Sequence, residues 1–255
     1  MNQRESEYLL SVALEIGKSM LSAGAEIWRV EDSIRRICKT YSIDNVEIYA
    51  LTTLIIATIK TKEGYHSTQS VRIEKVSNNL GKLESLNELS RYICKNAPNI
   101  KDIEYMTKKA VSSVNSGYYN CVGYILSSLS FAIFFGGSFL DGILAGVIGG
   151  IVFFMEKYCN LNGSNNLIYT MILSFITGCF GIILVKFGLG QNVDKIMIGN
   201  IMLFIPTLAL VNGVKDIFYR DIISGLYRII ESVLIALSVA LGFGLSLVVF
   251  GIFHI

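Results

Sequence analysis

The sequence predicts an α-helical integral membrane protein, with five transmembrane helices behind an N-terminal cytosolic α+β domain. The distribution of charge is the first observation: 30 of the 42 charged residues lie in residues 1–109, and only 12 lie in the 146 residues that follow. A soluble domain carries roughly a quarter of its residues as charged side chains throughout, so the second part lacks the polar residues to cover a surface in water. The second observation is that its charge-free runs approach the ~20 apolar residues of a membrane-spanning helix.

The N-terminal part alternates between helix and strand patterns. Apolar residues recur at helical spacing over 9–20, and Gly24 follows where that helix should end. The same spacing predicts a second helix over 27–41. Lys62–Gly64 has the composition of a turn between two strands. The remaining expected elements are strands over 46–50, 53–59 and 68–76, and helices over 80–89 and 100–110. The sequence therefore predicts a small α+β domain whose strands lie between two helix pairs.

The charge-poor part divides into five expected spans, at roughly 119–140, 140–158, 167–185, 196–214 and 230–253. The second is short, and the fourth is interrupted by Pro206. An asparagine-rich loop over 160–166 separates the second span from the third. The expected domains are thus a cytosolic domain over 1–115 and a membrane domain over 116–255. Glycines in the second, third and fifth spans predict close helix packing.

Loop charges set the expected orientation. With the N-terminal domain in the cytoplasm, the inside loops hold four basic residues, Lys157, Lys215, Arg220 and Arg228, and the outside loops hold two, Lys186 and Lys195. This bias follows the positive-inside rule. The chain opens on acidic residues without a signal-peptide pattern. We therefore expect a multi-pass protein of the plasma (inner) membrane, with the N-terminal domain inside and the C-terminus, His254-Ile255, outside.

Composition argues against several other classes. A net charge of +2 gives no basic face for nucleic acid. The five cysteines are scattered and lack metal-ligand spacing, so no metal or other cofactor is expected. His66 has no acid or cysteine nearby in sequence to form a catalytic pair, and no phosphate-binding loop motif occurs. No catalytic residues are predicted, and the chain is not expected to be an enzyme.

Three segments are more specific than periodicity requires. The first, Gly24–Glu31, reads GAEIWRVE and holds the only tryptophan; the second, Phe135–Asp141, reads FGGSFLD. The third runs from Ile205-Pro206 through Asn212-Gly213-Val214-Lys215-Asp216 and Asp221 to Ser224-Gly225-Leu226-Tyr227-Arg228 and Glu231.

Together these segments resemble the threonine/serine exporter (ThrE) family, over essentially the whole chain and in order. The resemblance is to its N-terminal module, in which a cytosolic domain precedes five spans, and the chain is similar to the YjjP-type large subunit of the split, two-subunit form. Two positions depart from the family pattern: Thr207 stands where the family has glycine after proline, and Lys215 where it has arginine. The resemblance implies export of threonine, serine or a succinate-like dicarboxylate. It also implies a partner, a small membrane subunit of the same family (YjjB-like), in a homo- or hetero-oligomer.

The residues suggest where such a function would lie. Pro206 removes a helical hydrogen bond inside a span, and transporters commonly bind substrate at interrupted helices. Asn200 and Asn212 are costly polar groups in the same span. The expected substrate or coupling candidates are Asn200, Pro206, Asn212, Asp216, Asp221, Arg228, Glu231 and Asp141. Gly24, Arg29 and Glu31 are expected to hold the joint between the first two helices. Proton coupling is assigned to Asp216, Asp221 or Glu231.

Two other functions stay open. A membrane-anchored metabolite sensor or regulatory protein would bind its ligand in the soluble domain and signal to a partner. A membrane-bound enzyme is disfavoured because no nucleophile–base or metal constellation occurs. Ionisable groups at span ends also serve as caps or topology signals, so the charged candidates have a structural alternative.

Overall fold

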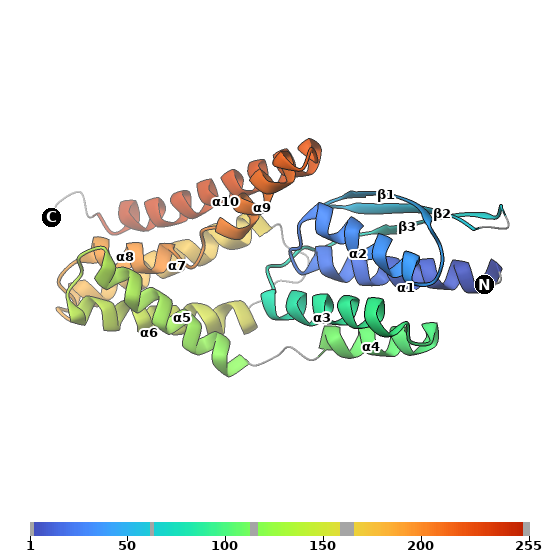
Figure 1. Ribbon diagram of the computed structural model, residues 1–255. Coiled ribbons are helices and arrows are strands. Elements are labelled where there is room, and N and C mark those ends of the chain that lie inside the picture. Colours follow the sequence, from blue (N-terminus) through green and yellow to red (C-terminus); the bar gives the residue numbers. More distant parts are fainter. Residues whose placement is uncertain (1–2, 62–63, 113–116, 159–165, 252–255) are drawn as a thin grey trace. The chain divides into compact units, whose positions relative to one another are not determined.

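The computed structural model describes residues 3–61, 64–112, 117–158 and 166–251 (Figure 1). These residues are mostly helical and include one small three-stranded sheet. The chain divides into two compact units. The first unit comprises Met1–Asn115 and Leu208–Ile229, and the second comprises Ser116–Thr207 and Ile230–Ile255. The predicted loop over 160–165, the turn residues Lys62-Glu63 and the C-terminal His254-Ile255 lie outside the described residues.

The first unit is built in layers from the predicted elements. Its elements are α1 (Gln3–Ser22), α2 (Ile27–Thr40), β1 (Asn45–Leu51), β2 (Leu54–Lys60), β3 (His66–Arg72), α3 (Leu80–Asn96), α4 (Ile100–Ser112), most of α9 (Thr207–Phe218) and the start of α10 (Ile222–Val249). The strands form an antiparallel meander in the order β1-β2-β3. Helices α1 and α2 pack on the sheet, and α3 and α4 pack on those helices.

Alternation along β2 explains how the sheet meets the helices. Ile55, Ala57 and Ile59 point to one face and are fully buried, whereas the residues between them are more exposed. The buried side chains join a single apolar cluster with Leu9 and Ile34 of the two helices. The expected helices and strands of this part are therefore confirmed, although α1 begins earlier and α3 ends later than the periodic residues indicated, and β3 covers His66–Arg72 instead of 68–76.

Gly24 ends α1, as its position predicts. Its φ of +95° is a left-handed backbone conformation that side-chain-bearing residues rarely adopt. The amide of Gly24 donates to the carbonyl of Leu21, and that of Ala25 donates to Met20. A Cβ at Gly24 would also lie 3.0 Å from Oδ1 of Asn78, so the site is closed to larger residues.

The second unit is a bundle of apolar helices. Its helices are α5 (Gly117–Phe134), α6 (Phe139–Tyr158), α7 (Asn166–Lys186), α8 (Val193–Ile201) and the larger part of α10. A Cβ on Gly149 of α6 would lie 2.8 Å from the carbonyl oxygen of Tyr124 in α5. The expected small-residue face of α6 therefore lets the two backbones approach closely.

Three helices in the described part of the chain are long and apolar enough to cross a membrane: α6, α7 and α10. The prediction of five spans is not confirmed. The first expected span coincides with α5, which has 18 residues and opens on Tyr118, Tyr119 and Asn120, so its apolar stretch is short. The fourth is divided into α8, of 9 residues, and α9, of 12, by Met202–Pro206.

The boundary between the two units of the chain falls within the fourth expected span. Leu208–Ile229 groups with the first unit, whereas Ser116–Thr207 and Ile230–Ile255 group with the second. Helix α10 continues through both units, and its 28 residues correspond to about 42 Å at 1.5 Å per residue, longer than a ~30 Å hydrocarbon core. The assignment of residues 1–115 to the cytosol and 116–255 to the membrane stays a prediction.

Candidate functional site

The joint between α1 and α2 (Gly24, Ala25 and Glu26) is held by side chains from α9 and α10. Asn212 donates through Nδ2 to the carbonyl of Gly24 at 3.0 Å. Arg228 donates through Nη2 to the carbonyl of Ala25 at 2.7 Å. Each bond joins residues about 190 to 200 positions apart in the chain. Two of the three specific segments of the sequence therefore meet in one polar contact, which we call the joint cluster.

Asp216 and Arg228 form the buried core of the joint cluster. Their exposed fractions are 0% and 5%, and Nε of Arg228 lies 3.2 Å from Oδ2 of Asp216. The other oxygen of Asp216 accepts the backbone N–H of Ile27 at 3.1 Å. Ile27 is the first residue of α2, and no side chain of its own N-cap residue bonds there. Asp216 thus caps a helix from a distant part of the chain, where the helix dipole favours a negative charge.

Glu26 links the same joint to two basic residues. Its Oε1 accepts from Nζ of Lys215 at 3.1 Å, and its Oε2 lies 3.1 Å from Nε of Arg29. Glu26 is buried, whereas Arg29 and Lys215 are partly exposed. Lys215 makes a single-point contact with Glu26, unlike the forked contact of which an arginine is capable.

Trp28 and Glu31 complete the contacts of α2. The ring of Trp28 stacks on that of Tyr219, with centroids 4.9 Å apart. Glu31 accepts the backbone N–H of Ala50 at 2.9 Å and so ties α2 to β1. Asp221 lies just before α10, and its backbone N–H donates to the carbonyl of Asp216.

Two glycines allow α9 and α10 to cross closely enough for these contacts. A Cβ on Gly225 would lie 2.6 Å from the carbonyl oxygen of Gly213, and one on Gly213 would lie 2.9 Å from that of Gly225. No side chain fits at either distance, because the opposing atoms are backbone. The Ser224-Gly225 and Asn212-Gly213 pairs of the sequence are therefore explained by this crossing.

Carboxyl groups of the joint cluster have shifted pKa values. Burial raises the pKa of Asp216 above its ordinary value, and the Arg228 guanidinium only partly offsets that effect. Burial also raises the pKa of Asp221 and of Glu31. Burial would raise the pKa of Glu26 as well, but the hydrogen bond from Lys215 and the charge of Arg29 lower it overall. The cluster therefore contains acids that bind a proton more readily than in water.

Asp141 has a different position, in the second unit. It is fully buried and accepts five hydrogen bonds: from the backbone and hydroxyl of Ser138, the backbone of Gln191, and the backbone and side chain of Asn192. The backbone N–H of Asp141 in turn donates to the Ser138 hydroxyl, which is the reciprocal pattern of a capping box. Asp141 thus stabilises the N-terminus of α6 and binds Gln191 and Asn192, the two residues just before α8.

Asn200 lies one turn before the break at Pro206 and is 1% exposed. Its Nδ2 donates to the carbonyl of Ile196 at 2.9 Å, and its Oδ1 has no hydrogen-bond partner among the described residues. By contrast, Thr170 and Thr177 bond to carbonyls four residues earlier in their own helix. Asn200 therefore keeps an acceptor open, as do the buried hydroxyls of Ser128 and Ser174 in the same unit, and it is the one of the three next to the break.

Comparison with known proteins gives one family match. The model of the ThrE family, described as "Putative threonine/serine exporter", matches residues 11–250. The chain belongs to the ThrE family. No curated protein and no solved structure matches it significantly. Membership of this exporter family, together with three long apolar helices, indicates a membrane transport protein.

The ThrE segments singled out in the sequence are brought together only in part. The joint cluster unites Gly24, Arg29, Asn212, Asp216 and Arg228. Asn200, Pro206, Asp141 and the exposed Glu231 belong to the second unit. In the described part of the chain no group of three or more His, Cys, Asp or Glu side chains could hold a metal ion.

Sequence reasoning did not foresee which groups would pair. The structure pairs Arg228 with Asp216 across two helices, a contact that the sequence did not predict. The stack of Trp28 on Tyr219 and the binding of Asp141 by Asn192 were also missed. The available signal was the occurrence of a lone tryptophan and of polar residues in otherwise apolar segments.

Proposed function

We propose that this chain is a subunit of a secondary transporter that exports small polar metabolites, either threonine/serine-type amino acids or succinate-like dicarboxylates. Export is driven by the proton gradient, and a second, small membrane subunit of the same family completes the pathway. The first unit faces the cytoplasm and the protein lies in the inner membrane. Family membership over residues 11–250 supports the assignment to membrane transport. The identity of the substrate goes beyond that assignment and is part of the proposal.

The observation that carries the proposal is the interruption of the fourth apolar segment. Helix α8 ends at Ile201, and α9 begins only at Thr207, after Pro206. Backbone groups freed within a membrane are tolerated where protein or a water-filled cavity covers them, and transporters place substrate at such breaks. Asn200, with its open Oδ1, lies beside the break and can accept a hydrogen bond from a substrate ammonium or hydroxyl group.

Proton coupling is assigned to Asp216, with Asp221 as the neighbouring acid. The pKa of both carboxyl groups is raised by burial, so they can exchange a proton nearer to physiological pH than an exposed aspartate. Protonation of Asp216 would remove the charge that pairs with Arg228 and caps α2. Protonation would thus weaken the contacts that connect the α1–α2 joint to α9 and α10.

Counterflow in proteoliposomes tests the proposal. Labelled serine, threonine and succinate are offered to vesicles that contain this chain alone, the small subunit alone, or both. Saturable flux with both subunits supports the proposal, and the preferred label identifies the substrate class. Binding of these compounds without flux, from folded protein, would instead favour the metabolite sensor.

Variants at two sites separate substrate contact from coupling. Asn200→Ala should raise the concentration for half-maximal flux, because it removes the open acceptor. Asp216→Asn should leave counterflow between equal pH values intact and abolish flux driven by a pH gradient. Asp102→Asn is the matched control, because Asp102 is an exposed aspartate on α4 that takes no part in the joint cluster. Unchanged pH-driven flux in Asp216→Asn would remove Asp216 from the coupling mechanism.

A further inference from the structure

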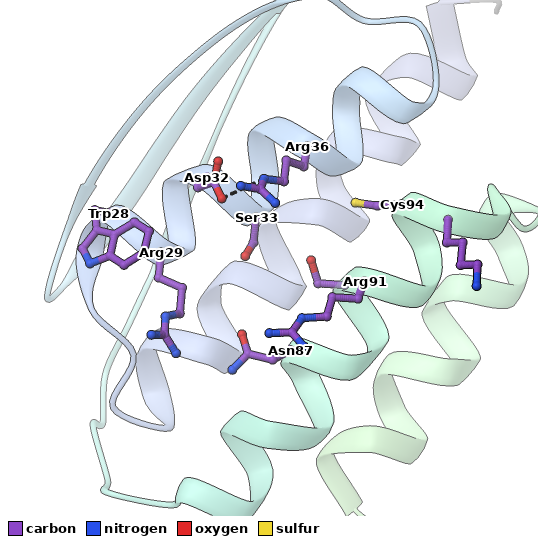
Figure 2. A pocket seen from close by; sticks show the side chains of 10 residues that line it. Trp28, Arg29, Asp32, Ser33, Arg36, Asn87, Arg91 and Cys94 are labelled. Carbon is purple, nitrogen blue, oxygen red and sulfur yellow. Dashed lines mark ion pairs between the residues drawn. The ribbon is translucent and has the colours of Figure 1, made fainter.

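A cavity of about 500 Å³ lies between α2 and α3 of the first unit, apart from the joint cluster's buried ion pair. Its size is that of a pocket for a small molecule. The lining is polar and basic: Arg29 and Arg36 come from α2, and Arg91 and Lys95 come from α3. Figure 2 shows Arg29 and Arg91 extending from their helices toward the same space.

The positive charges of this cavity are only half compensated. Arg29 is paired with Glu26, and Nε of Arg36 lies 2.8 Å from Oδ2 of Asp32. Arg91 and Lys95 form no ion pair with any residue that the structure describes. They lie four residues apart on one helix, where like charges repel and destabilise the helix. Two cations thus remain for a partner from outside the chain.

Two buried serines point to the same conclusion. Ser33 of α2 is 8% exposed and Ser90 of α3 is 7% exposed, and both line the cavity. Neither hydroxyl makes a hydrogen bond to another described residue. Figure 2 shows the hydroxyl of Ser33 directed into the space between the helices. Both hydroxyls open into the cavity, where they can donate to a ligand or to water.

We propose that the α2–α3 cavity binds a small molecule that carries a phosphate monoester. A phosphate monoester brings a charge of about −1.5 to −2 in one compact group, which matches the two unpaired cations. Its oxygens accept from serine hydroxyls and from the two parallel N–H groups of a guanidinium. The site adds a ligand-binding, regulatory function to the first unit and does not depend on the proposed transport substrate.

Trp28 provides the readout, because it is the only tryptophan of the chain and lines this cavity. The full chain, purified in an uncharged detergent, is titrated with glycerol 3-phosphate while Trp28 fluorescence is followed. Phosphatidic acid in phosphatidylcholine vesicles is the second probe, because a lipid headgroup offers the same phosphate monoester. Succinate serves as a dianion without phosphate.

Arg91→Gln is the test variant, since Arg91 is exposed and has no ion partner whose loss would disturb folding. Removing a charged hydrogen bond should weaken binding roughly tenfold or more. Lys82→Gln, on the same helix but outside the cavity lining, should change it less than about twofold. Ser33→Ala should weaken binding by a smaller factor than Arg91→Gln, because the lost bond has a neutral donor.

Saturable binding of glycerol 3-phosphate that Arg91→Gln weakens would support a soluble ligand. A response to phosphatidic acid vesicles alone, with the same sensitivity to Arg91→Gln, would support the site with a lipid as its occupant. Equal affinity in Arg91→Gln and the parent protein would overturn the proposal. Tighter binding of succinate than of either phosphate probe, or no saturable response to any of them, would overturn it too.

Discussion

Replacing Arg228 by methionine should destabilise the first unit more than any other single change in the joint cluster. Arg228 is the only cation within ion-pair distance of Asp216 that the described structure shows, and both side chains are buried. Breaking a buried pair from one side costs about 3–5 kcal/mol, because the remaining charge is left uncompensated. At roughly 2–4 °C per kcal/mol, a loss of about 3 kcal/mol lowers the unfolding temperature by roughly 6–12 °C.

Replacing Asp216 should cost less stability than replacing Arg228. Burial raises the pKa of Asp216 even with Arg228 present, so the charged carboxylate is the expensive partner. Asp216→Asn keeps an acceptor for the Ile27 N–H and removes that charge, and it should therefore cost much less than Arg228→Met. The double variant Asp216→Asn with Arg228→Met should be more stable than Arg228→Met alone, since no buried charge is left unpaired.

The contribution of Asp216 to folding stability should fall as the pH rises. A carboxyl whose pKa is raised in the folded state binds a proton more tightly there than in the unfolded chain. The stability it contributes is fully present below the unfolded pKa of about 3.8 and is lost as the pH rises through the higher folded value. The deficit of Arg228→Met should consequently shrink as the pH is lowered, because protonated Asp216 no longer needs a partner.

Thermal unfolding of the full chain in detergent, followed by Trp28 fluorescence, measures these effects, because Trp28 stacks on Tyr219 beside the cluster. Lys101→Met is the control, because Lys101 is exposed on α4. A shift below about 2 °C for Arg228→Met, or a double variant whose loss equals the sum of the single losses, would refute the reasoning.

Three further predictions concern packing, capping and thiol reactivity. Gly225→Ala should destabilise the chain by roughly 1–3 kcal/mol, because its Cβ would meet backbone, whereas Gly244→Ala on the same helix meets open space and should be near neutral. Asp141→Ala should cost about 3 kcal/mol in the second unit, measured by circular dichroism during heating, because five donors lose their acceptor. Burial raises the pKa of Cys38 to about 12, so maleimide at pH 8 should label Cys94 of the cavity and leave Cys38 unmodified, as read by peptide mass spectrometry.

Each of these has a matched comparison. Asp194 is exposed in the first turn of α8, and Asp194→Ala should change stability by less than about 0.5 kcal/mol. Equal effects of Asp194→Ala and Asp141→Ala would contradict the capping role. Equal effects of the two glycine substitutions would contradict the close crossing of α9 and α10. Rapid labelling of Cys38 in the folded chain would contradict its burial.

Local patterns were sufficient to predict the elements of the first unit. The helix periodicity of residues 9–20, the strand composition of residues 53–59 and the terminating Gly24 each express a rule that acts over a few residues. The pairing of Asp216 with Arg228 and the capping of α2 by Asp216 could not be derived in this way. The cap joins Ile27 to a residue 189 positions away, and the ion pair joins residues of two different helices, so helix periodicity holds no information on either contact.

In the apolar part of the chain, too, local features were predicted from the sequence and long-range features were not. Composition predicted the apolar helices, and three of them are long and apolar enough to span. The break after Ile201 was signalled by Pro206, but its length and the grouping of Leu208–Ile229 with the first unit were not. Those features depend on polar side chains of α9 that find partners in the α1–α2 joint.

Transport itself is tested most directly by counterflow of labelled serine, threonine and succinate in proteoliposomes that contain this chain with the proposed small membrane subunit. The account predicts saturable flux that requires this chain, is weakened by Asn200→Ala, and loses its response to a pH gradient in Asp216→Asn. The absence of flux for all three labels, from folded protein with both subunits present, would contradict it.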